Sequence, residues 1–371
     1  MKTSIYKIIN IDLSKQYQFI LGKNLIFEIA NHINLKANQK VLIVSDEVVW
    51  SIYGMMVDAS FSNFKNKVFT HILKSGEVEK NYKNLFEILN KLGENGFSKT
   101  DLILSIGGGV IGDISGLAAG LYQRGIYHVM VATTVLSAVD SSVGGKTAIN
   151  LDCGKNIVGM INQPNRVICD ISVFNTLSDR LFYEGIVESI KYAMIYDPSM
   201  LELFNNDVRN PKYIYQIIDR SVTSKYNIVK MDEYDDGIRK ILNFGHTLGH
   251  AIEILSGFDL RHGEAVGIGM LIMTKLSEKL GYLKNDFDRG SKINRLLNGK
   301  MPGEYLKTLL RKYGLPTELS YGIGDLMQYI SVDKKIREDY ISLILLENLG
   351  KARIENIAKD ELEGFLNEIK Y

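Results

Sequence analysis

The chain has 371 residues, of which 46% are hydrophobic and 23% are charged, and these fractions are ordinary for a folded globular protein. Its 44 basic and 43 acidic side chains give a formal net charge of +1, which argues against a nucleic-acid partner, because such proteins carry a basic excess. High hydrophobicity with low net charge also excludes intrinsic disorder. The length predicts about two domains, at roughly 150 residues each.

Cysteine content and hydropathy indicate the compartment. The two cysteines, Cys153 and Cys169, are too few for a disulfide framework and do not form a CxxC pair. We therefore expect a reducing, cytoplasmic location. The first residues contain no apolar segment, so we expect no signal peptide. No apolar run approaches about 18 residues, so we also expect no membrane span and no membrane partner.

The first half of the chain alternates predicted strands and helices. Short apolar runs that are typical of buried strands occur at residues 41–44, 102–106, 129–131 and 167–169. Leu85, Ile88 and Leu92 recur at helical spacing and predict an amphipathic helix that ends near Gly96. This alternation predicts an α/β domain with a mostly parallel, Rossmann-like sheet and helices on both faces.

A glycine-rich segment follows the predicted strand at 102–106. Gly107, Gly109 and Gly112 satisfy the pattern G-x-G-x-x-G at the start of a predicted helix, where glycines allow a pyrophosphate to approach the helix N-terminus. A purely structural turn is the alternative. The next strand ends in Ala132 where an acid usually stands, and Asp46, after an earlier strand, is the better candidate. We therefore expect a nucleotide-binding domain that departs from the standard Rossmann arrangement.

From about residue 178 the pattern becomes helical. Helices are predicted at residues 179–195, 213–231, 241–255, 264–280 and 359–369. Two strand-like runs, at 340–346 and 352–354, predict a hairpin across residues 348–350. We place the domain boundary near residue 177, which gives an α/β domain over 1–177 and a helical domain over 178–371.

Three of the six histidines lie within 17 residues of one another. His246 and His250 are four residues apart, on one face of a predicted helix, and His262 precedes the next helix. A zincin protease needs Glu directly after the first His, but Thr247 stands there. Two histidines and one carboxylate form a common catalytic zinc site, so we predict a metal site here.

The spacing leaves the carboxylate ligand open. Glu264, Glu253 and Glu188 are the candidates, and Glu188 has Lys191 three residues later on the same helix face. Packed core histidines with satisfied hydrogen bonds are the alternative for one or two members of the cluster. We interpret the remaining histidines as structural or surface residues: His32, His71 and His128.

Basic and amide side chains suggest an anionic substrate. Lys146, Lys155 and Asn156 follow glycines and Arg124 precedes one, and we interpret these segments as glycine-rich loops. Basic residues in such loops suit a phosphate group, although a solvated surface loop would explain any one of them.

Arg239 and Asn243 are four residues apart on a predicted helix and suit a carboxylate, and an exposed polar helix face is the alternative. The residues thus predict that a nicotinamide-type nucleotide, one divalent metal and a phosphorylated, carboxylated small molecule meet between two domains.

With these motifs the chain resembles the 3-dehydroquinate synthase family, within the sugar phosphate cyclase superfamily. The resemblance runs from about residue 41 to 349, and together its segments, in family order, make coincidence very improbable. The matching segments are GGGVIGD (107–113), YQRG (122–125), VDSSVGGKT (139–147), GKNIVG (154–159), ESIKY (188–192), LNFGHTLGHAIE (242–253), HGEAV (262–266) and DKK (333–335).

The resemblance implies an N-terminal NAD-binding α/β domain, a C-terminal α-helical metal-binding domain and a site in the cleft. It implies NAD and Zn²⁺ as cofactors, with other divalent metals such as Co²⁺ as substitutes. The implied zinc ligands are Glu188, His246 and His262. The implied NAD-binding residues are Asp46, Glu77, Lys80, Gly108, Gly109, Val110, Asp113, Thr133, Thr134, Asp140, Ser141, Lys146, Lys155 and Thr176.

The implied reaction converts 3-deoxy-D-arabino-heptulosonate 7-phosphate to 3-dehydroquinate and phosphate, in the shikimate pathway of aromatic amino acid biosynthesis. It proceeds by transient oxidation with NAD, phosphate elimination, reduction, ring opening and intramolecular aldol closure. The resemblance also implies a homodimer, in which Arg124 reaches the partner subunit. The implied substrate residues are Lys146, Asn156, His250, Arg124, Lys334 or Lys335 for phosphate, Asp140, Lys191 and Lys225 for ring hydroxyls, and Arg239 and Asn243 for the carboxylate.

The chain departs from the family pattern at three places. Ala132 precedes Thr133-Thr134 where the family has Pro, Ile161-Asn162 replace an aromatic pair, and Ser178 replaces a Pro. None of these departures removes a catalytic group.

Three alternative functions remain open. The first is another sugar phosphate cyclase, such as 2-deoxy-scyllo-inosose synthase, whose substrate lacks a carboxylate and would not need Arg239 or Asn243. The second is a metal-dependent NAD alcohol dehydrogenase of related fold, which would produce NADH. The third is a regulator without activity, but such a protein would have lost ligands that this chain retains.

Overall fold

The computed structural model describes residues 6–33, 35–36, 38–283, 292–332 and 340–368. The chain divides into two compact units. Unit 1 comprises Met1–Phe182 and Arg209–Tyr234, and unit 2 comprises Tyr183–Val208 and Asp235–Tyr371. The domain boundary that we predict near residue 177, between 1–177 and 178–371, remains a prediction. Within the described ranges, we find no helix with the length and apolar character that a membrane crossing requires.

Unit 1 is built on a seven-stranded sheet. Its strands are β1 (Tyr6–Asp12), β2 (Gln16–Gly22), β3 (Val41–Asp46), β4 (Val68–Leu73), β5 (Leu102–Gly107), β6 (Tyr127–Ala132) and β9 (Arg166–Asp170). They lie in the order β1-β2-β9-β6-β5-β3-β4. β1 and β2 pair antiparallel, and every other neighbouring pair is parallel. The prediction of a mostly parallel α/β sheet is therefore confirmed.

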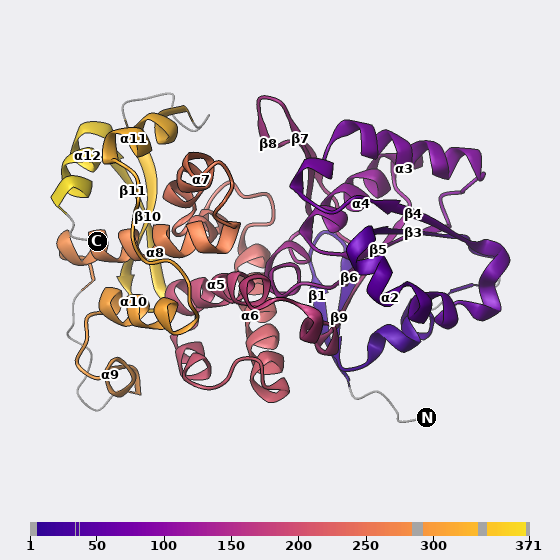
Figure 1. The fold of residues 1–371 in the computed structure, drawn as a ribbon, viewed down its shortest axis with the longest axis horizontal. Coiled ribbons are helices and arrows are strands. Elements are labelled where there is room, and N and C mark those ends of the chain that lie inside the picture. Colours follow the sequence, from indigo (N-terminus) through magenta and orange to yellow (C-terminus); the bar gives the residue numbers. More distant parts are fainter. Residues whose placement is uncertain (1–5, 34, 37, 284–291, 333–339, 369–371) are drawn as a thin grey trace. The chain divides into compact units, whose positions relative to one another are not determined.

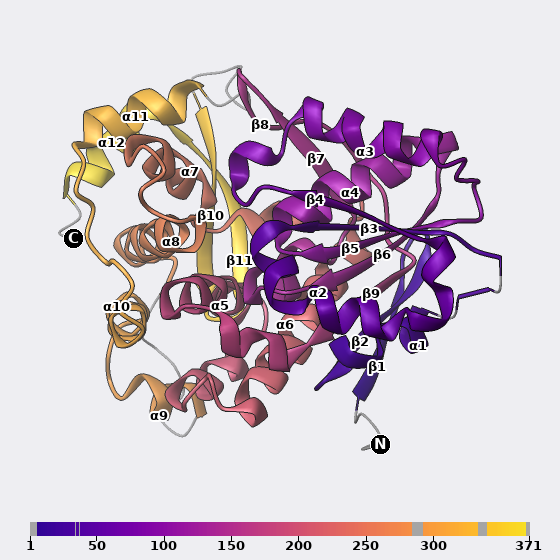
Figure 2. The ribbon, with the colours of Figure 1, turned by 45° about the vertical axis from the view of Figure 1, so that its right-hand side comes forward.

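Helices cover both faces of this sheet. α3 and α4 lie on one face, and α1 and α2 lie on the other (Figures 1 and 2). Buried apolar residues of β3 and β5 pack against α3 and α4, with Ile88, Ile103 and Ile114 fully buried. The α-helices of this unit are α1 (Ile29–Ile33), α2 (Glu47–Ser60), α3 (Tyr82–Glu94), α4 (Gly109–Leu121) and α6 (Pro211–Met231). Its short 3-10 helices are η1 (Leu25–Glu28), η2 (Ser62–Lys67), η3 (Glu77–Glu79), η4 (Tyr122–Arg124) and η6 (Ile171–Thr176), and η5 (Ser137–Ser141) is a short π-helix.

A hairpin stands apart from the main sheet of unit 1. It is formed by β7 (Lys146–Leu151) and β8 (Gly154–Ile161), which pair antiparallel. The interpretation of Lys146, Lys155 and Asn156 as loop residues was wrong, because all three lie in these strands. β8 exposes most of its side chains, so no alternation of apolar and polar residues marks it in the sequence.

Unit 2 is mainly helical, with one two-stranded sheet. Its elements are α5 (Asp179–Ile195), which begins at the end of unit 1, η7 (Pro198–Asn205), η8 (Ile238–Asn243), α7 (His246–Leu255), α8 (His262–Lys279), α9 (Lys292–Leu297), α10 (Pro302–Lys312), α11 (Ile323–Val332), β10 (Tyr340–Asn348), β11 (Lys351–Ala358) and α12 (Lys359–Glu368). β10 and β11 form the predicted hairpin. The predicted helix at 179–195 has the bounds of α5, and those predicted at 264–280 and 359–369 correspond to α8 and α12.

The predicted helix at 241–255 was wrong at its start. The chain there forms η8, a 3-10 helix, and α7 begins only at His246. Gly245 separates them with φ of 79°, a left-handed conformation that an α-helix cannot continue. A Cβ at Gly245 would lie 2.7 Å from the backbone nitrogen of Met270 in α8. Tertiary packing, which the local pattern does not record, therefore sets this break.

Candidate metal centre and nucleotide site

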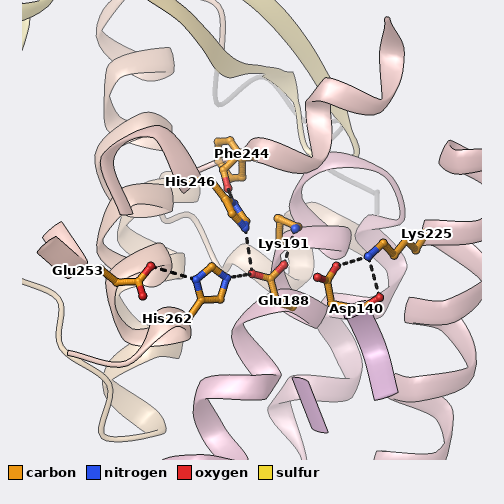
Figure 3. A network of polar contacts seen from close by, with 8 residues as sticks. All are labelled: Asp140, Glu188, Lys191, Lys225, Phe244, His246, Glu253 and His262. Carbon is orange, nitrogen blue, oxygen red and sulfur yellow. Dashed lines mark hydrogen bonds and ion pairs between the residues drawn. The ribbon is translucent and has the colours of Figure 1, made fainter. Parts of the chain in front are cut away.

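Glu188, His246 and His262 come together within unit 2 (Figure 3). One potential ligand atom of each lies within 4.8 Å of the other two. Nε2 of His246 lies 3.4 Å from Oε1 of Glu188, and Nε2 of His262 lies 3.5 Å from the same oxygen. Glu188 is fully buried, whereas the two histidine side chains are 13% and 29% exposed. The cluster is thus open on the histidine side.

Three helices position these side chains. α5 carries Glu188, while His246 and His262 are the first residues of α7 and α8. α7 and α8 approach closely through glycines, because a Cβ at Gly269 would lie 2.1 Å from the carbonyl oxygen of Gly245. This contact sets the residue that precedes α7 against α8, about two turns after His262.

Each histidine has an oxygen on the far side of its ring. Nδ1 of His246 lies 3.1 Å from the carbonyl oxygen of Phe244, and Nδ1 of His262 lies 3.3 Å from Oε2 of Glu253. Metal-binding histidines usually donate their second N–H to such an acceptor, which fixes the tautomer and orients the ring. In this arrangement both Nε2 atoms face Glu188.

The charges around Glu188 shift the histidines in opposite directions. Lys191 forms a buried ion pair with Oε2 of Glu188. Burial, together with the charge of Lys191, lowers the pKa of His246 well below its usual range. Burial also opposes protonation of His262, but the carboxylates of Glu188 and Glu253 outweigh it and raise the pKa of His262 to about 10.

The donor set fits a divalent metal ion. Zinc takes histidine nitrogen and carboxylate oxygen at about 2.0–2.2 Å in tetrahedral geometry, which places neighbouring ligand atoms about 3.4 Å apart. The separations of 3.4 and 3.5 Å from Oε1 of Glu188 match this spacing. Among the other candidate carboxylates, Glu264 accepts a hydrogen bond from the backbone nitrogen of Arg261 at 2.8 Å and caps α8. A second group is formed by His250, Glu253 and His262, in which one potential ligand atom of each residue also lies within 4.8 Å of the other two.

Arg239 and Asn243 lie in η8, the latter as its last residue. In a 3-10 helix, residues three apart lie on the same face, and residues four apart do not. The prediction that a helical spacing of four aligns Arg239 with Asn243 was therefore wrong. Arg239 is 3% exposed, which excludes the alternative of an exposed polar face for this side chain. Their role as a carboxylate clamp stays a prediction.

Sequence reasoning missed Glu184, one helical turn before Glu188 on α5. Its side chain is buried and its Oε1 lies 3.4 Å from Nη1 of Arg261. Burial raises the pKa of Glu184 to about 7, against the opposing effect of Arg261. The spacing of four residues from Glu188 is the signal that would have found it.

In unit 1, the predicted nucleotide residues gather at one edge of the sheet. Asp46 ends β3, Gly107 ends β5, and Thr133 and Thr134 follow β6. β5 pairs parallel with both β3 and β6, so these ends are adjacent. Ligands of open α/β sheets bind at the carboxyl ends of the strands, and this edge is therefore suited to a nucleotide.

Buried polar atoms at this edge also fit a ligand. Oγ1 of Thr133 and Oγ of Ser141 are buried and make no hydrogen bond within the described part of the chain. A Cβ at Gly108 would lie 3.3 Å from Cγ2 of Thr134, and one at Gly109 would lie 3.4 Å from Oγ of Ser141. The glycines therefore keep open a cradle that side chains would narrow, and it is lined by groups able to bind a nucleotide.

Asp46 and Thr176 also have structural partners. Oδ1 of Asp46 accepts hydrogen bonds from the backbone nitrogens of Val48 and Val49 at 3.0 Å and so caps α2. Burial raises the pKa of Asp46. Oγ1 of Thr176 donates to the carbonyl oxygen of Val173 at 2.9 Å.

Lys80 joins predicted nucleotide and phosphate residues in one network. Its Nζ forms an ion pair with Asp113 and donates to Oδ1 of Asn156 at 2.5 Å. Asn150 donates to Oε1 of Glu77 at 2.8 Å. Burial raises the pKa of Asp113 to about 6, although Lys80 opposes the shift.

Several other predicted residues lie in unit 1. Nζ of Lys225, on α6, donates to the backbone oxygen and to Oδ1 of Asp140, both at 2.7 Å (Figure 3). Lys146 is exposed at the start of β7, Lys155 is exposed on β8, and Arg124 is exposed at the end of η4. Lys334 and Lys335 lie outside the described residues.

Solved structures define the structural class. The chain is similar to 2-deoxy-scyllo-inosose synthase complexed with carbaglucose-6-phosphate, NAD⁺ and Co²⁺ (TM-score 0.83, 24% identity, 98% of this chain and 100% of that chain). It is also similar to a 2-epi-5-epi-valiolone synthase from Streptomyces hygroscopicus with NAD⁺ and Zn²⁺ bound (TM-score 0.81, 24% identity, 97% of this chain and 98% of that chain). The fold is thus one that these cyclases share.

Sequence comparison defines the family. The family models for the 3-dehydroquinate synthase N-terminal and C-terminal regions match residues 70–184 and 185–336. The 3-dehydroquinate synthase of Clostridium acetobutylicum is 35% identical over 95% of this chain and 97% of its own length. That of Thermoanaerobacter pseudethanolicus is 37% identical over 88% of this chain and 89% of its own length. The chain belongs to the 3-dehydroquinate synthase family.

Proposed function

We propose that this chain is a lyase that converts 3-deoxy-D-arabino-heptulosonate 7-phosphate to 3-dehydroquinate and phosphate, in the shikimate pathway. The observation that carries the proposal is the assembled Glu188–His246–His262 set in a chain of this family. Relatives named for this activity align with nearly the whole chain. The structurally similar inosose synthase is only 24% identical and therefore supports the fold alone.

We propose Zn²⁺ at Glu188, His246 and His262, and NAD at the sheet edge that carries Asp46, Gly108 and Thr133. The donor spacing of 3.4 and 3.5 Å and the buried hydroxyls of Thr133 and Ser141 support this assignment. NAD⁺ with Co²⁺ or Zn²⁺ in the similar cyclase structures supports it further. When bound, NAD supplies a reversible hydride acceptor and the metal a Lewis acid for the substrate hydroxyl.

The chain's own residues would hold and orient the substrate. Lys225 is fixed by the two hydrogen bonds that it donates to Asp140, and Lys191 is fixed by its ion pair with Glu188, so both ammonium groups present donors to hydroxyls in set positions. Restricting the substrate in this way lowers the entropic cost of later ring closure.

The two anionic ends of the substrate need separate partners. For the phosphate we propose Lys146, Asn156, His250 and Arg124, with Arg124 acting across a homodimer, and Lys334 or Lys335. Arg239 and Asn243 would bind the carboxylate, because a guanidinium forms paired hydrogen bonds with a carboxylate. The nearly complete burial of Arg239 strengthens such a contact, since little water competes with it.

The test is a product assay on the purified protein. Protein, 3-deoxy-D-arabino-heptulosonate 7-phosphate, NAD and Zn²⁺ are incubated, and phosphate and dehydroquinate are measured together. We expect equal release of the two products, and loss of both after treatment with a chelator. Glucose 6-phosphate serves as the control substrate. Phosphate release from glucose 6-phosphate alone would contradict the proposal and would favour the inosose synthase reaction.

A further inference from the structure

His262 contacts a carboxylate on each side of its ring. Nε2 lies 3.5 Å from Oε1 of Glu188, and Nδ1 lies 3.3 Å from Oε2 of Glu253 (Figure 3). A neutral imidazole has one lone pair for a metal, and its other nitrogen carries the proton. We propose that Glu253 is a positioning residue, which accepts the hydrogen bond from Nδ1 of His262 and so directs the Nε2 lone pair to the metal. This inference rests on the metal site of the proposed function.

The position of Glu253 in α7 suits this task. It lies seven residues, or about two helical turns, after His246, so both side chains project from the same face of the helix. The residue is 7% exposed, and a buried carboxylate is costly unless it is paired. Nδ1 of His262 supplies a partner for that charge.

His246 offers an internal comparison. Its Nδ1 faces a backbone oxygen, that of Phe244, at 3.1 Å. Nδ1 of His262, the first residue of α8, instead lies 3.3 Å from a side-chain oxygen of α7, Oε2 of Glu253. A side chain of the neighbouring helix therefore supplies to His262 what the backbone supplies to His246.

The group of His250, Glu253 and His262 raises a competing role, in which Glu253 is itself a metal ligand. If a metal ion occupied each of the two groups at the same time, both ring nitrogens of His262 would be metal ligands. The ring would then have to lose both N–H protons and become an imidazolate. A hydrogen bond from Nδ1 requires no such ionisation. The positioning role is therefore compatible with a metal on Nε2, and metal stoichiometry separates the two roles.

Two substitutions isolate the contact. Glu253→Met keeps the length of the side chain but removes the acceptor, whereas Glu253→Gln keeps an oxygen acceptor and removes the charge. Co²⁺ alone is the probe, with affinity and stoichiometry measured by competition with a chromophoric chelator and geometry by the visible spectrum. Outer-shell partners typically change metal affinity about 10- to 100-fold.

We expect one Co²⁺ per wild-type chain, lost in Glu188→Gln. Glu253→Met should bind Co²⁺ roughly 10- to 100-fold more weakly with a changed spectrum, and Glu253→Gln roughly three- to tenfold more weakly, a partial rescue. The matched control is Glu278→Gln on α8, which removes a carboxylate that accepts from the backbone nitrogen of Gly303 at 2.7 Å. Its Co²⁺ affinity should match that of the wild type, even if its stability falls.

Wild-type affinity in both Glu253 variants would overturn the inference, as would two Co²⁺ per wild-type chain with one lost in Glu253→Met. If Glu253→Met does not fold, Glu253→Gln decides alone. No Co²⁺ bound by the wild-type chain would overturn the metal site and the inference together. Because the measurement uses neither substrate nor NAD, Co²⁺ binding without dehydroquinate formation would contradict only the proposed function.

Discussion

At the scale of single residues, the metal centre depends on what lies behind each ligand. His246 and His262 each have an oxygen at Nδ1, and Lys191 balances the buried charge of Glu188. Spacing along the chain offered three candidate carboxylates and could not choose among them, because spacing records neither burial nor direction; the family resemblance implied Glu188. The fold separates them: Glu188 faces both Nε2 atoms, while Glu264 caps a helix.

His128 gives a prediction about pH. It is buried in β6, and Nε2 lies 2.9 Å from Oγ of Ser105. Burial lowers the pKa of His128 to about 3, from 6.5. The unfolded chain therefore binds a proton between pH 6.5 and 3 that the folded chain excludes, so stability falls as pH falls through this window.

Between pH 7 and pH 5 this residue should cost the wild-type protein about 2 kcal/mol of unfolding free energy. Urea unfolding at both pH values measures this loss of unfolding free energy. In His128→Gln the loss should be smaller than in the wild type by about 2 kcal/mol, because the amide does not titrate. Equal losses in the two proteins would show that His128 is not held neutral.

At the scale of elements, α7 and α8 must approach closely for the two histidines to meet. Gly269→Ala would place a methyl group 2.1 Å from the carbonyl oxygen of Gly245, directly before His246. We expect the free energy of unfolding to fall by about 1–3 kcal/mol, because overpacking forces the helices apart. We also expect Co²⁺ binding to weaken.

Gly267→Ala on the same helix is the control for this prediction. Its Cβ would lie 3.4 Å from Cδ2 of Leu310, an ordinary contact, and alanine favours the helix by up to about 1 kcal/mol. Thermal unfolding and chelator competition check both variants. Equal behaviour of the two would mean that the glycine contact does not position the metal ligands.

The elements also show where sequence reasoning succeeds. Periodicity predicted α5 with its bounds and the hairpin of β10 and β11, since both have strong local patterns. It missed β1, β2, β4 and the hairpin of β7 and β8. It also predicted one continuous helix across Gly245. Packing of Gly245 against α8, rather than local preference, interrupts the helix there.

At the scale of the whole molecule, the two units divide the proposed work. Unit 1 presents the ends of β3, β5 and β6 for a nucleotide, and unit 2 holds the metal ligands. The glycine pattern at Gly107–Gly112 predicted the first and the histidine spacing predicted the second, because each motif is local in sequence. The net charge of +1 offers little overall attraction for an anionic substrate, so local basic groups must provide it.

In the proposed reaction, NAD is used and regenerated within each turnover. The most direct measurement counts dehydroquinate formed per NAD, with one NAD supplied per chain and substrate in excess, while absorbance follows NADH. We expect many dehydroquinate molecules per NAD and no accumulation of NADH. One oxidised product per NAD, with an equal amount of NADH, would contradict it and would indicate an alcohol dehydrogenase instead.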